Sequence, residues 1–104
     1  YPTHALLDPE LTLTLPVSWT AATGADALSH AMEAYWNRHA NPISDVYALE
    51  AVKRIFEALP LAVTDPGNIQ PRTRMLLASL LAGLACNWLG EGRRAALAPK
   101  LGRR

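Results

Sequence analysis

Asp26 and His30 are the residues of this chain whose types and spacing most directly suggest chemistry. They stand four residues apart in the helix-compatible run Gly24-Ala25-Asp26-Ala27-Leu28-Ser29-His30. On a helix this spacing puts both side chains on one face, one turn apart. A carboxylate oxygen and an imidazole nitrogen placed in this way could bind one Fe²⁺, Zn²⁺ or Mn²⁺ ion. Two ligands leave a metal site incomplete, so the spacing alone equally allows a surface ion pair or a buried hydrogen-bonded pair.

Four further residues could join or support such a site. Glu33 could orient a metal ligand as a hydrogen-bond acceptor, or it could be a solvated helix charge. We expect His39 to cap the C-terminal end of the same helix rather than to bind a metal, because an imidazolium ion interacts favourably with a helix C-terminus. His4, near the start of the chain, is expected to have no role. Cys86 is expected to be a small core residue, since no histidine follows it that could activate a thiol.

The helix that carries Asp26 and His30 is predicted to start at Thr20 or Thr23, with threonine as its cap, and to stop near His39. Its apolar residues recur at spacings of three and four, which predicts one buried stripe. The members of that stripe are Ala27, Leu28, Ala31, Met32, Tyr35 and Trp36.

Two more helices should pack against this one. Asn41-Pro42 favours a helix start, because Asn caps well and Pro fits the first helical position. That second helix is predicted to break at Pro60, after an apolar stripe of Val46, Leu49, Val52, Ile55, Phe56 and Leu59. The third should begin near Pro71 and run to about Trp88, and it is apolar nearly all round, which is typical of a helix with neighbours on several sides.

The flanking segments differ from this helical part. The alternation in Leu11-Thr12-Leu13-Thr14-Leu15 predicts a short strand or an extended connector. Residues 1–90 carry five Lys and Arg against eight Asp and Glu, whereas residues 91–104 carry five against one. We therefore predict an all-α chain with an extended entry segment (residues 1–19), a partial helical metal-binding domain (residues 20–88) and an atypical basic tail (residues 89–104).

Composition excludes several classes of function. The tail offers scattered basic residues among Ala, Gly and Pro, unlike the ordered basic face of a nucleic-acid-binding protein. The longest apolar stretch, Met75 to Trp88, is shorter than the roughly 20 residues that a membrane-spanning helix needs. A single cysteine cannot form an internal disulfide, which fits a cytoplasmic protein. We expect no nucleic-acid or membrane partner.

Several ordered motifs together closely resemble the iron-containing (group III) alcohol dehydrogenases. They are Asp8-Pro9-Glu10-Leu11-Thr12, Thr20-Ala21-Ala22-Thr23-Gly24, Asp26-Ala27-Leu28-Ser29-His30-Ala31-Met32-Glu33, Ala40-Asn41-Pro42-Ile43-Ser44-Asp45 and the run from Met75 to Ala85. The resemblance covers residues 6–85. Ser29, Trp36-Asn37 and the run Asn41-Pro42-Ile43-Ser44-Asp45 look most like the phosphonoacetaldehyde-reductase branch.

The resemblance implies part of a two-domain enzyme of the dehydroquinate-synthase-like fold, in which an NAD(P)-binding domain precedes an all-helical one. The family binds its divalent metal, Fe²⁺ first and Zn²⁺ as the alternative, through one aspartate and three histidines. Asp26 and His30 match the first two of these ligands in the family's GxDALxHxxE motif. The resemblance further implies a small alcohol or aldehyde substrate, a homo-oligomer and a cytoplasmic location.

The departures from the family matter as much as the matches. Where the family continues into a segment such as HALAHPLG, residues 86–104 contain no histidine, and the chain has no GxGxxG or GxxxxGK phosphate loop. We therefore expect a fragment that holds two of four metal ligands and is inactive alone. The alternative is a non-catalytic helical module that associates with itself through exposed apolar helix faces.

Overall fold

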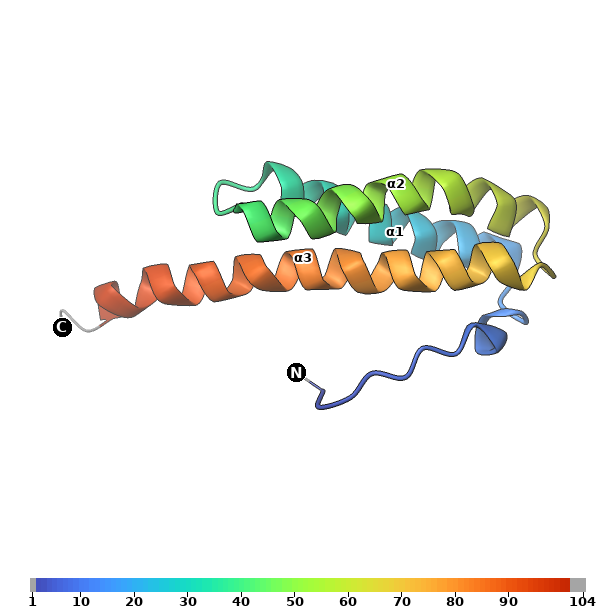
Figure 1. Ribbon diagram of the computed structural model, residues 1–104, viewed down its shortest axis with the longest axis horizontal. Coiled ribbons are helices and arrows are strands. Elements are labelled where there is room, and N and C mark those ends of the chain that lie inside the picture. The colour runs from blue at the N-terminus through green and yellow to red at the C-terminus, as the bar shows by residue number, and fades with distance from the viewer. Residues whose placement is uncertain (1, 102–104) are drawn as a thin grey trace.

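Three antiparallel α-helices form a bundle with a short entry segment along one side. The structure, a computed structural model, describes residues 2–101, and it describes side chains for residues 2–89. The elements are the 3₁₀ helix η1 (Pro9–Thr12) and the helices α1 (Val17–Trp36), α2 (Pro42–Thr64) and α3 (Ile69–Leu101). The helices lie side by side, and α3 extends beyond the other two (Figure 1). Within residues 2–101 there is no strand, so the all-α prediction is confirmed.

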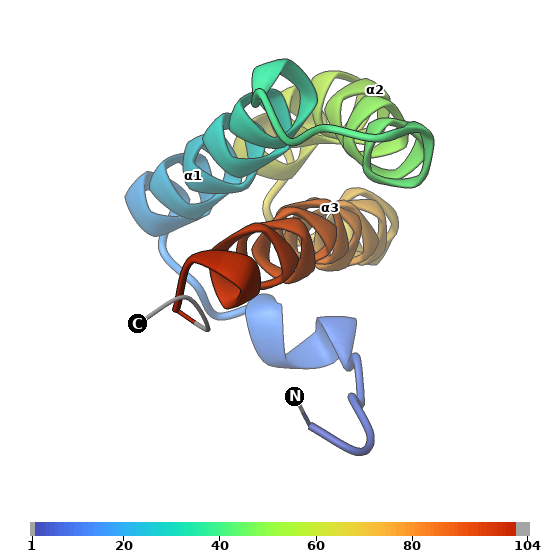
Figure 2. The same cartoon turned by 90° about the vertical axis from the view of Figure 1, so that its left-hand side faces the viewer.

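The entry segment contains the helical turn η1, whereas we predicted a short strand or an extended connector from Leu11 to Leu15. The Asp8 carboxylate accepts a hydrogen bond of 3.0 Å from the backbone N–H of Glu10, and Pro9 occupies the first helical position. An acidic cap and a proline favour a helical turn over the alternating pattern that follows. The strand prediction is therefore wrong. Seen from the end, this segment lies beside α3, on the side away from α1 and α2 (Figure 2).

Helix α1 begins at Val17, three residues before the nearer of the two predicted threonine caps, and ends before His39. Pro16 is its N-cap and makes no side-chain cap, while Thr20 and Thr23 lie inside the helix. The Thr23 hydroxyl donates to the carbonyl of Trp19 at 2.7 Å. Pro16 itself has an extended ψ of 148°, and its carbonyl accepts the first hydrogen bond of the helix from the Thr20 N–H at 2.9 Å, so the helix begins directly after the proline.

Helix α2 starts as predicted and continues past its proline. The Asn41 side chain accepts hydrogen bonds from the N–H groups of Ile43 and Ser44, and the Ser44 hydroxyl oxygen accepts one from the Asn41 backbone N–H. The predicted break at Pro60 is wrong, because the helix runs on to Thr64. Pro60 is exposed, so water can solvate the carbonyl it leaves unpaired, while Ala58 and Ala62 on the opposite face are fully buried.

Helix α3 starts earlier and ends later than predicted. The Asn68 side chain accepts from the backbone N–H of Gln70 at 3.1 Å, which places the start at Ile69 and leaves Pro71 in the first turn. The helix does not stop at Trp88 but continues to Leu101. The side chains of the predicted basic tail, from residue 90 onward, lie outside the described part of the chain.

The core consists mainly of alanine, and the predicted stripes contained only part of it, namely Ala27, Ala31 and Ile55. The buried apolar side chains are Ala27, Ala31, Ala34, Ala48, Ala51, Ile55, Ala58, Ala62, Ala78, Ala82, Ala85 and Leu89. Several larger residues that we placed in the core are exposed, namely Tyr35, Trp36, Val46, Leu49 and Phe56. Small side chains let helix backbones approach closely. At Gly24 a Cβ atom would overlap the side chain of Leu59, and its Cγ would lie only 3.2 Å away.

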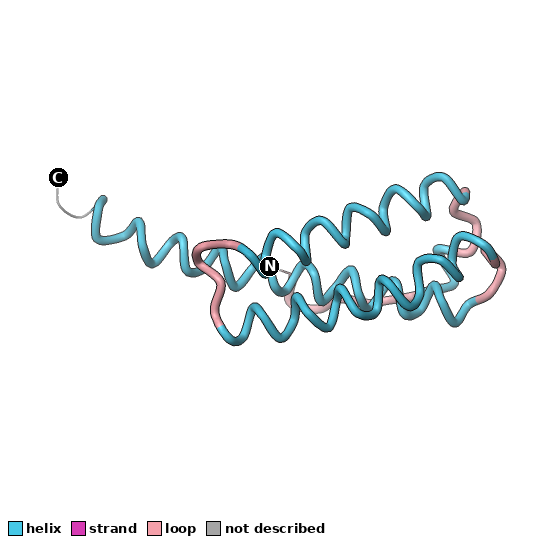
Figure 3. The backbone as a smooth tube through the Cα atoms, turned by 90° about the horizontal axis from the view of Figure 1, so that it is seen from above, coloured by secondary structure: helices cyan, strands magenta, loops and turns pink. Residues whose placement is uncertain are grey.

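Short loops join the helices at alternate ends of the bundle (Figure 3). No helix in the described chain is both long and apolar enough to cross a membrane.

Candidate metal centre

Asp26 and His30 lie on α1 in contact with each other, as their spacing predicts. The distance from His30 Nδ1 to Asp26 Oδ2 is 3.4 Å, and the side chains are 51% and 70% exposed, respectively. The alternatives to a metal pair were a surface ion pair and a buried hydrogen-bonded pair, and this exposure shows that the buried pair is wrong. A surface pair of this exposure contributes little to stability, so folding alone gives no strong reason for these two residue types.

A backbone hydrogen bond fixes the His30 ring in one tautomer. Nδ1 lies 2.9 Å from the carbonyl oxygen of Asp26. Since a carbonyl oxygen only accepts, the proton of this bond belongs to Nδ1, and the neutral ring then has its lone pair on Nε2. Histidines that bind metals commonly donate their other ring N–H to a carbonyl or carboxylate, which orients the ring and makes the ligating nitrogen more basic.

The described residues supply no third ligand. Within them, no group of three or more His, Cys, Asp or Glu side chains is arranged to hold a metal ion. The sequence has no histidine after His39, so two further histidines cannot come from later in this chain. The residues present fit one half of a four-ligand site.

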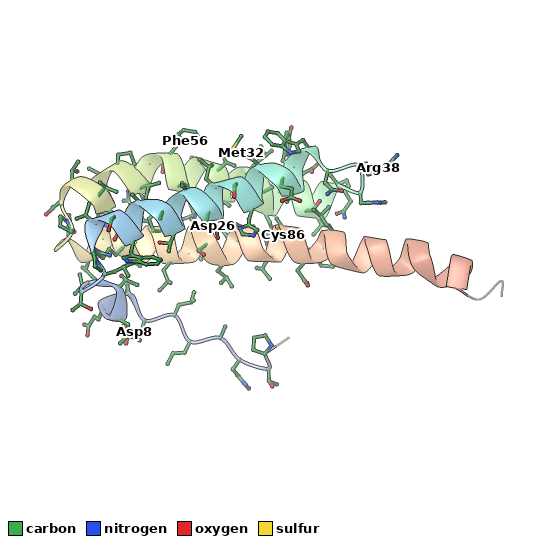
Figure 4. All side chains as sticks on the ribbon, turned by 180° about the vertical axis from the view of Figure 1, so that it is seen from behind. Asp8, Asp26, Met32, Arg38, Phe56 and Cys86 are labelled. Atoms are coloured by element: carbon green, nitrogen blue, oxygen red, sulfur yellow. The ribbon has the colours of Figure 1, made fainter. Side chains whose placement is uncertain are left out.

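Cys86 of α3 borders this pair, which the sequence did not indicate. Its Sγ lies 3.4 Å from the carbonyl oxygen of His30, and Figure 4 shows Asp26 and Cys86 on the same side of the two neighbouring helices. Burial, and secondly the negative charge of Glu33, raise the pKa of the Cys86 thiol. Cys86 is half-buried and packs against the core cluster around Ala34 and Ala85, as we predicted for a small core residue.

Glu33 does not act as the hydrogen-bond partner that we considered for a ligand. The recorded partners of His30 Nδ1 are both atoms of Asp26, and Glu33 makes no hydrogen bond to another described residue. Glu33 is exposed and acts on the site only through its charge.

The two other histidines lie away from the pair. His39 follows the C-cap Asn37, and its backbone N–H, not its ring, bonds to the Asn37 side chain at 2.9 Å. The prediction that His39 caps α1 is wrong, because the helix has already ended at Trp36. His4 is exposed in the entry segment.

A family model describes most of this chain. The model of the C-terminal part of the Fe-containing alcohol dehydrogenase family matches residues 20–104. The match continues past residue 85, where we expected the family pattern to end, so that boundary was wrong.

Individual relatives agree with the family model. The chain is 47% identical over 91 residues to the NAD-dependent methanol dehydrogenase of Bacillus methanolicus, covering 88% of this chain and 24% of the relative. It is 45% identical over 101 residues to the 1,3-propanediol dehydrogenase of Klebsiella pneumoniae, covering 97% and 26%.

A solved structure shares the fold. The sulfoacetaldehyde reductase of Bifidobacterium kashiwanohense, solved in complex with NAD⁺, is 46% identical and superposes with a TM-score of 0.80, covering 82% of this chain and 23% of that one. The chain thus spans about a quarter of the length of these relatives. It belongs to the iron-containing alcohol dehydrogenase family and corresponds to part of the family's C-terminal helical domain.

Proposed function

We propose that this chain supplies the first two metal ligands, Asp26 and His30, of a metal-dependent, NAD(P)-linked alcohol dehydrogenase or aldehyde reductase. The observation that carries the proposal is the exposed pair itself, in which the Asp26 carbonyl holds the Nδ1 proton of His30 and leaves Nε2 with the lone pair. The same contact would form in a simple surface pair, so the family membership is the second support.

Each residue has a defined part in this proposal. Asp26 would offer a carboxylate oxygen, and His30 would offer Nε2, from positions one helical turn apart on α1. A divalent metal ion held there supplies Lewis acidity toward a carbonyl or alkoxide oxygen. We propose Fe²⁺ as the ion, with Zn²⁺ as the alternative, because both accept oxygen and imidazole ligands.

The remaining ligands, the nicotinamide cofactor and the substrate would require parts of the enzyme other than this chain. The chain contains only two of the expected ligands and lacks a glycine-rich phosphate loop. We therefore propose that it is inactive by itself. The relatives named above carry methanol, propanediol and sulfoacetaldehyde in their names at nearly equal identity, so sequence identity does not favour one alcohol or aldehyde.

Metal content tests this proposal. The wild-type chain and the variants Asp26→Ala, His30→Ala and His39→Ala would be purified without chelator, loaded with Fe²⁺ or Zn²⁺ under defined conditions, and analysed by plasma mass spectrometry. We expect bound metal in the wild-type chain and in His39→Ala, which removes an exposed histidine outside the pair. We expect a loss in the other two variants. Equal metal in all four proteins would refute the assignment.

A second candidate function, self-association as a helical module, is favoured by the apolar face of α2. Val46, Leu49 and Phe56 recur along this helix at near-helical spacing and are exposed. Large exposed apolar patches commonly mark interaction surfaces. Sedimentation velocity should then show a dimer or larger species that dissociates in Phe56→Asp but persists in Thr73→Asp, a change at an exposed site on α3. A wild-type monomer at high concentration would contradict this candidate.

The two candidates are compatible. A dimer could bring the Asp26 and His30 pairs of two chains to one metal ion, which would give one ion for every two chains. A ratio of one ion per chain would exclude this shared site and leave the first proposal intact.

A further inference from the structure

A cavity of about 220 Å³ lies at the end of the bundle where α1 and α3 begin and α2 ends. The entry segment closes one side of it, and this end of the molecule is on the right in Figure 1. Its walls include Thr12 and Leu15 of the entry segment, Thr23 and Gly24 of α1, and Met75 and Ser79 of α3. The cavity therefore lies between several elements of the fold, and neither Asp26 nor His30 lines it.

Among the side chains that the structure describes, Arg72 is the one charged group that lines this cavity, and it is 3% exposed. Its Nε donates to the carbonyl of Pro66 at 2.7 Å, its Nη1 to the Thr20 hydroxyl at 3.3 Å, and its Nη2 to the carbonyl of Leu15 at 3.4 Å. A guanidinium group has five N–H donors. These bonds use three of them and leave one N–H on each terminal nitrogen.

No carboxylate among the side chains of residues 2–89 forms an ion pair with Arg72. The ion pairs of the described residues are His30–Asp26 and Arg54–Glu50, and neither involves Arg72. Glu91, whose side chain is outside the described part, follows Arg72 by 19 residues on α3, about 28 Å along the helix at ~1.5 Å per residue. A buried cation is costly unless an anion pairs with it. The three neutral acceptors supply hydrogen bonds but no negative charge.

The shape and polarity of the cavity select the kind of anion. Two free N–H groups on the two terminal nitrogens match the two oxygens of a carboxylate. Apolar side chains, among them Leu15, Ala27 and Met75, also line the cavity, and this apolar wall suits a short alkyl chain. A doubly charged phosphate would exceed the single positive charge that Arg72 supplies.

We propose that this cavity binds a short-chain monocarboxylate, with its carboxylate on the Arg72 guanidinium and its alkyl chain against the apolar wall. The site is distinct from the Asp26–His30 pair and does not depend on the function proposed above. The sequence carried a signal for it, because Arg72 stands three residues before Met75 and so lies on the same, largely apolar face of its helix.

Calorimetric titration of the 104-residue chain with sodium acetate, butyrate and phosphate, at constant ionic strength set with sodium chloride, tests the proposal. We expect saturable binding of butyrate, roughly tenfold tighter than acetate because two more methylene groups are buried. Phosphate should bind more weakly than butyrate. Absence of saturable butyrate binding, or phosphate binding at least as tightly, would overturn the proposal.

Three variants locate the binding. Arg72→Gln should lose butyrate binding at least tenfold, whereas Arg74→Gln, at an exposed arginine two residues away, should bind like the wild-type chain. Arg72→Gln could fail to fold because Arg72 ties three segments together. Thr23→Phe therefore adds bulk at the exposed rim without touching the guanidinium and should also lose binding. Full binding by a folded Thr23→Phe, or an equal loss in Arg74→Gln, would contradict the assignment.

Discussion

Ile55 provides the most quantitative test of the packing in this bundle. It is 1% exposed and is the largest fully buried apolar side chain of residues 2–89, in a cluster with Ala27 and Ala78. Ile55→Ala removes three carbon atoms, which is about 2.4 kcal/mol at ~0.8 kcal/mol per buried carbon. The unfilled cavity adds to this, so we expect the free energy of unfolding to fall by about 3 kcal/mol. A domain of this length is stable by only about 5–15 kcal/mol, so the loss is large.

Phe56→Ala is the matched control. It removes a larger side chain from the next position of the same helix, but Phe56 is 66% exposed and points away from the bundle. Its loss should cost less than about 1 kcal/mol. Urea unfolding followed by circular dichroism at 222 nm would give both values, at two protein concentrations so that any contribution from self-association is visible. A cost for Phe56→Ala that equals or exceeds that of Ile55→Ala, independent of concentration, would refute the orientation of α2.

Three further predictions rest on local contacts. Asn41→Ala removes the side chain that caps α2 and should lower the free energy of unfolding by about 1 kcal/mol in the same urea experiment, with Asn41→Asp nearly neutral. Glu50→Gln weakens an ion pair with Arg54 that is partly exposed, so it should change stability by less than about 0.5 kcal/mol, and a larger loss would mean that this pair is more buried than described. Burial and the charge of Glu33 raise the pKa of Cys86, so at a pH near 8 it should have less thiolate than a free cysteine, and iodoacetamide should alkylate it more slowly. Glu33→Gln should speed this alkylation, and an unchanged rate would mean that the Glu33 charge has no effect on the thiol.

The start of α2 was predictable because a side chain caps the backbone there. Asn41-Pro42 indicated the start of α2 correctly, because Asn accepts the free N–H groups of the first turn and Pro needs no partner there. The end of α2 was not predictable from Pro60 alone. Burial of Ala58 and Ala62 on the opposite face offsets the lost hydrogen bond, and such tertiary packing is not visible in a local pattern.

The composition of the core could also not be predicted from the local sequence pattern. We assigned Trp36 and Phe56 to the inside, yet both are exposed, whereas Ala48 and Ala51, which the predicted stripes left out, are fully buried. Close approach of three helices favours small side chains at their contacts, so the stripe of alanines, rather than the stripe of large residues, marks the inner face.

The candidate site was predictable only where its residues are neighbours on one helix. The spacing of Asp26 and His30 correctly placed them together, since it depends only on the helix period. Their neighbour Cys86 comes from α3, 56 residues later in the chain, and a contact over that distance in sequence has no local signal.

The imidazole nitrogens of His30 give the most direct test of the proposed metal ligation. Proton–nitrogen correlation spectra of the ¹⁵N-labelled chain would be followed during titration with Zn²⁺, which is diamagnetic. We predict that Nε2 of His30 shifts while Nδ1 keeps its proton, because Nδ1 is held by the Asp26 carbonyl, and that Asp26→Ala weakens the response. An unchanged His30 spectrum while His4 or His39 responds, or a shift at His30 Nδ1 instead of Nε2, would contradict the account.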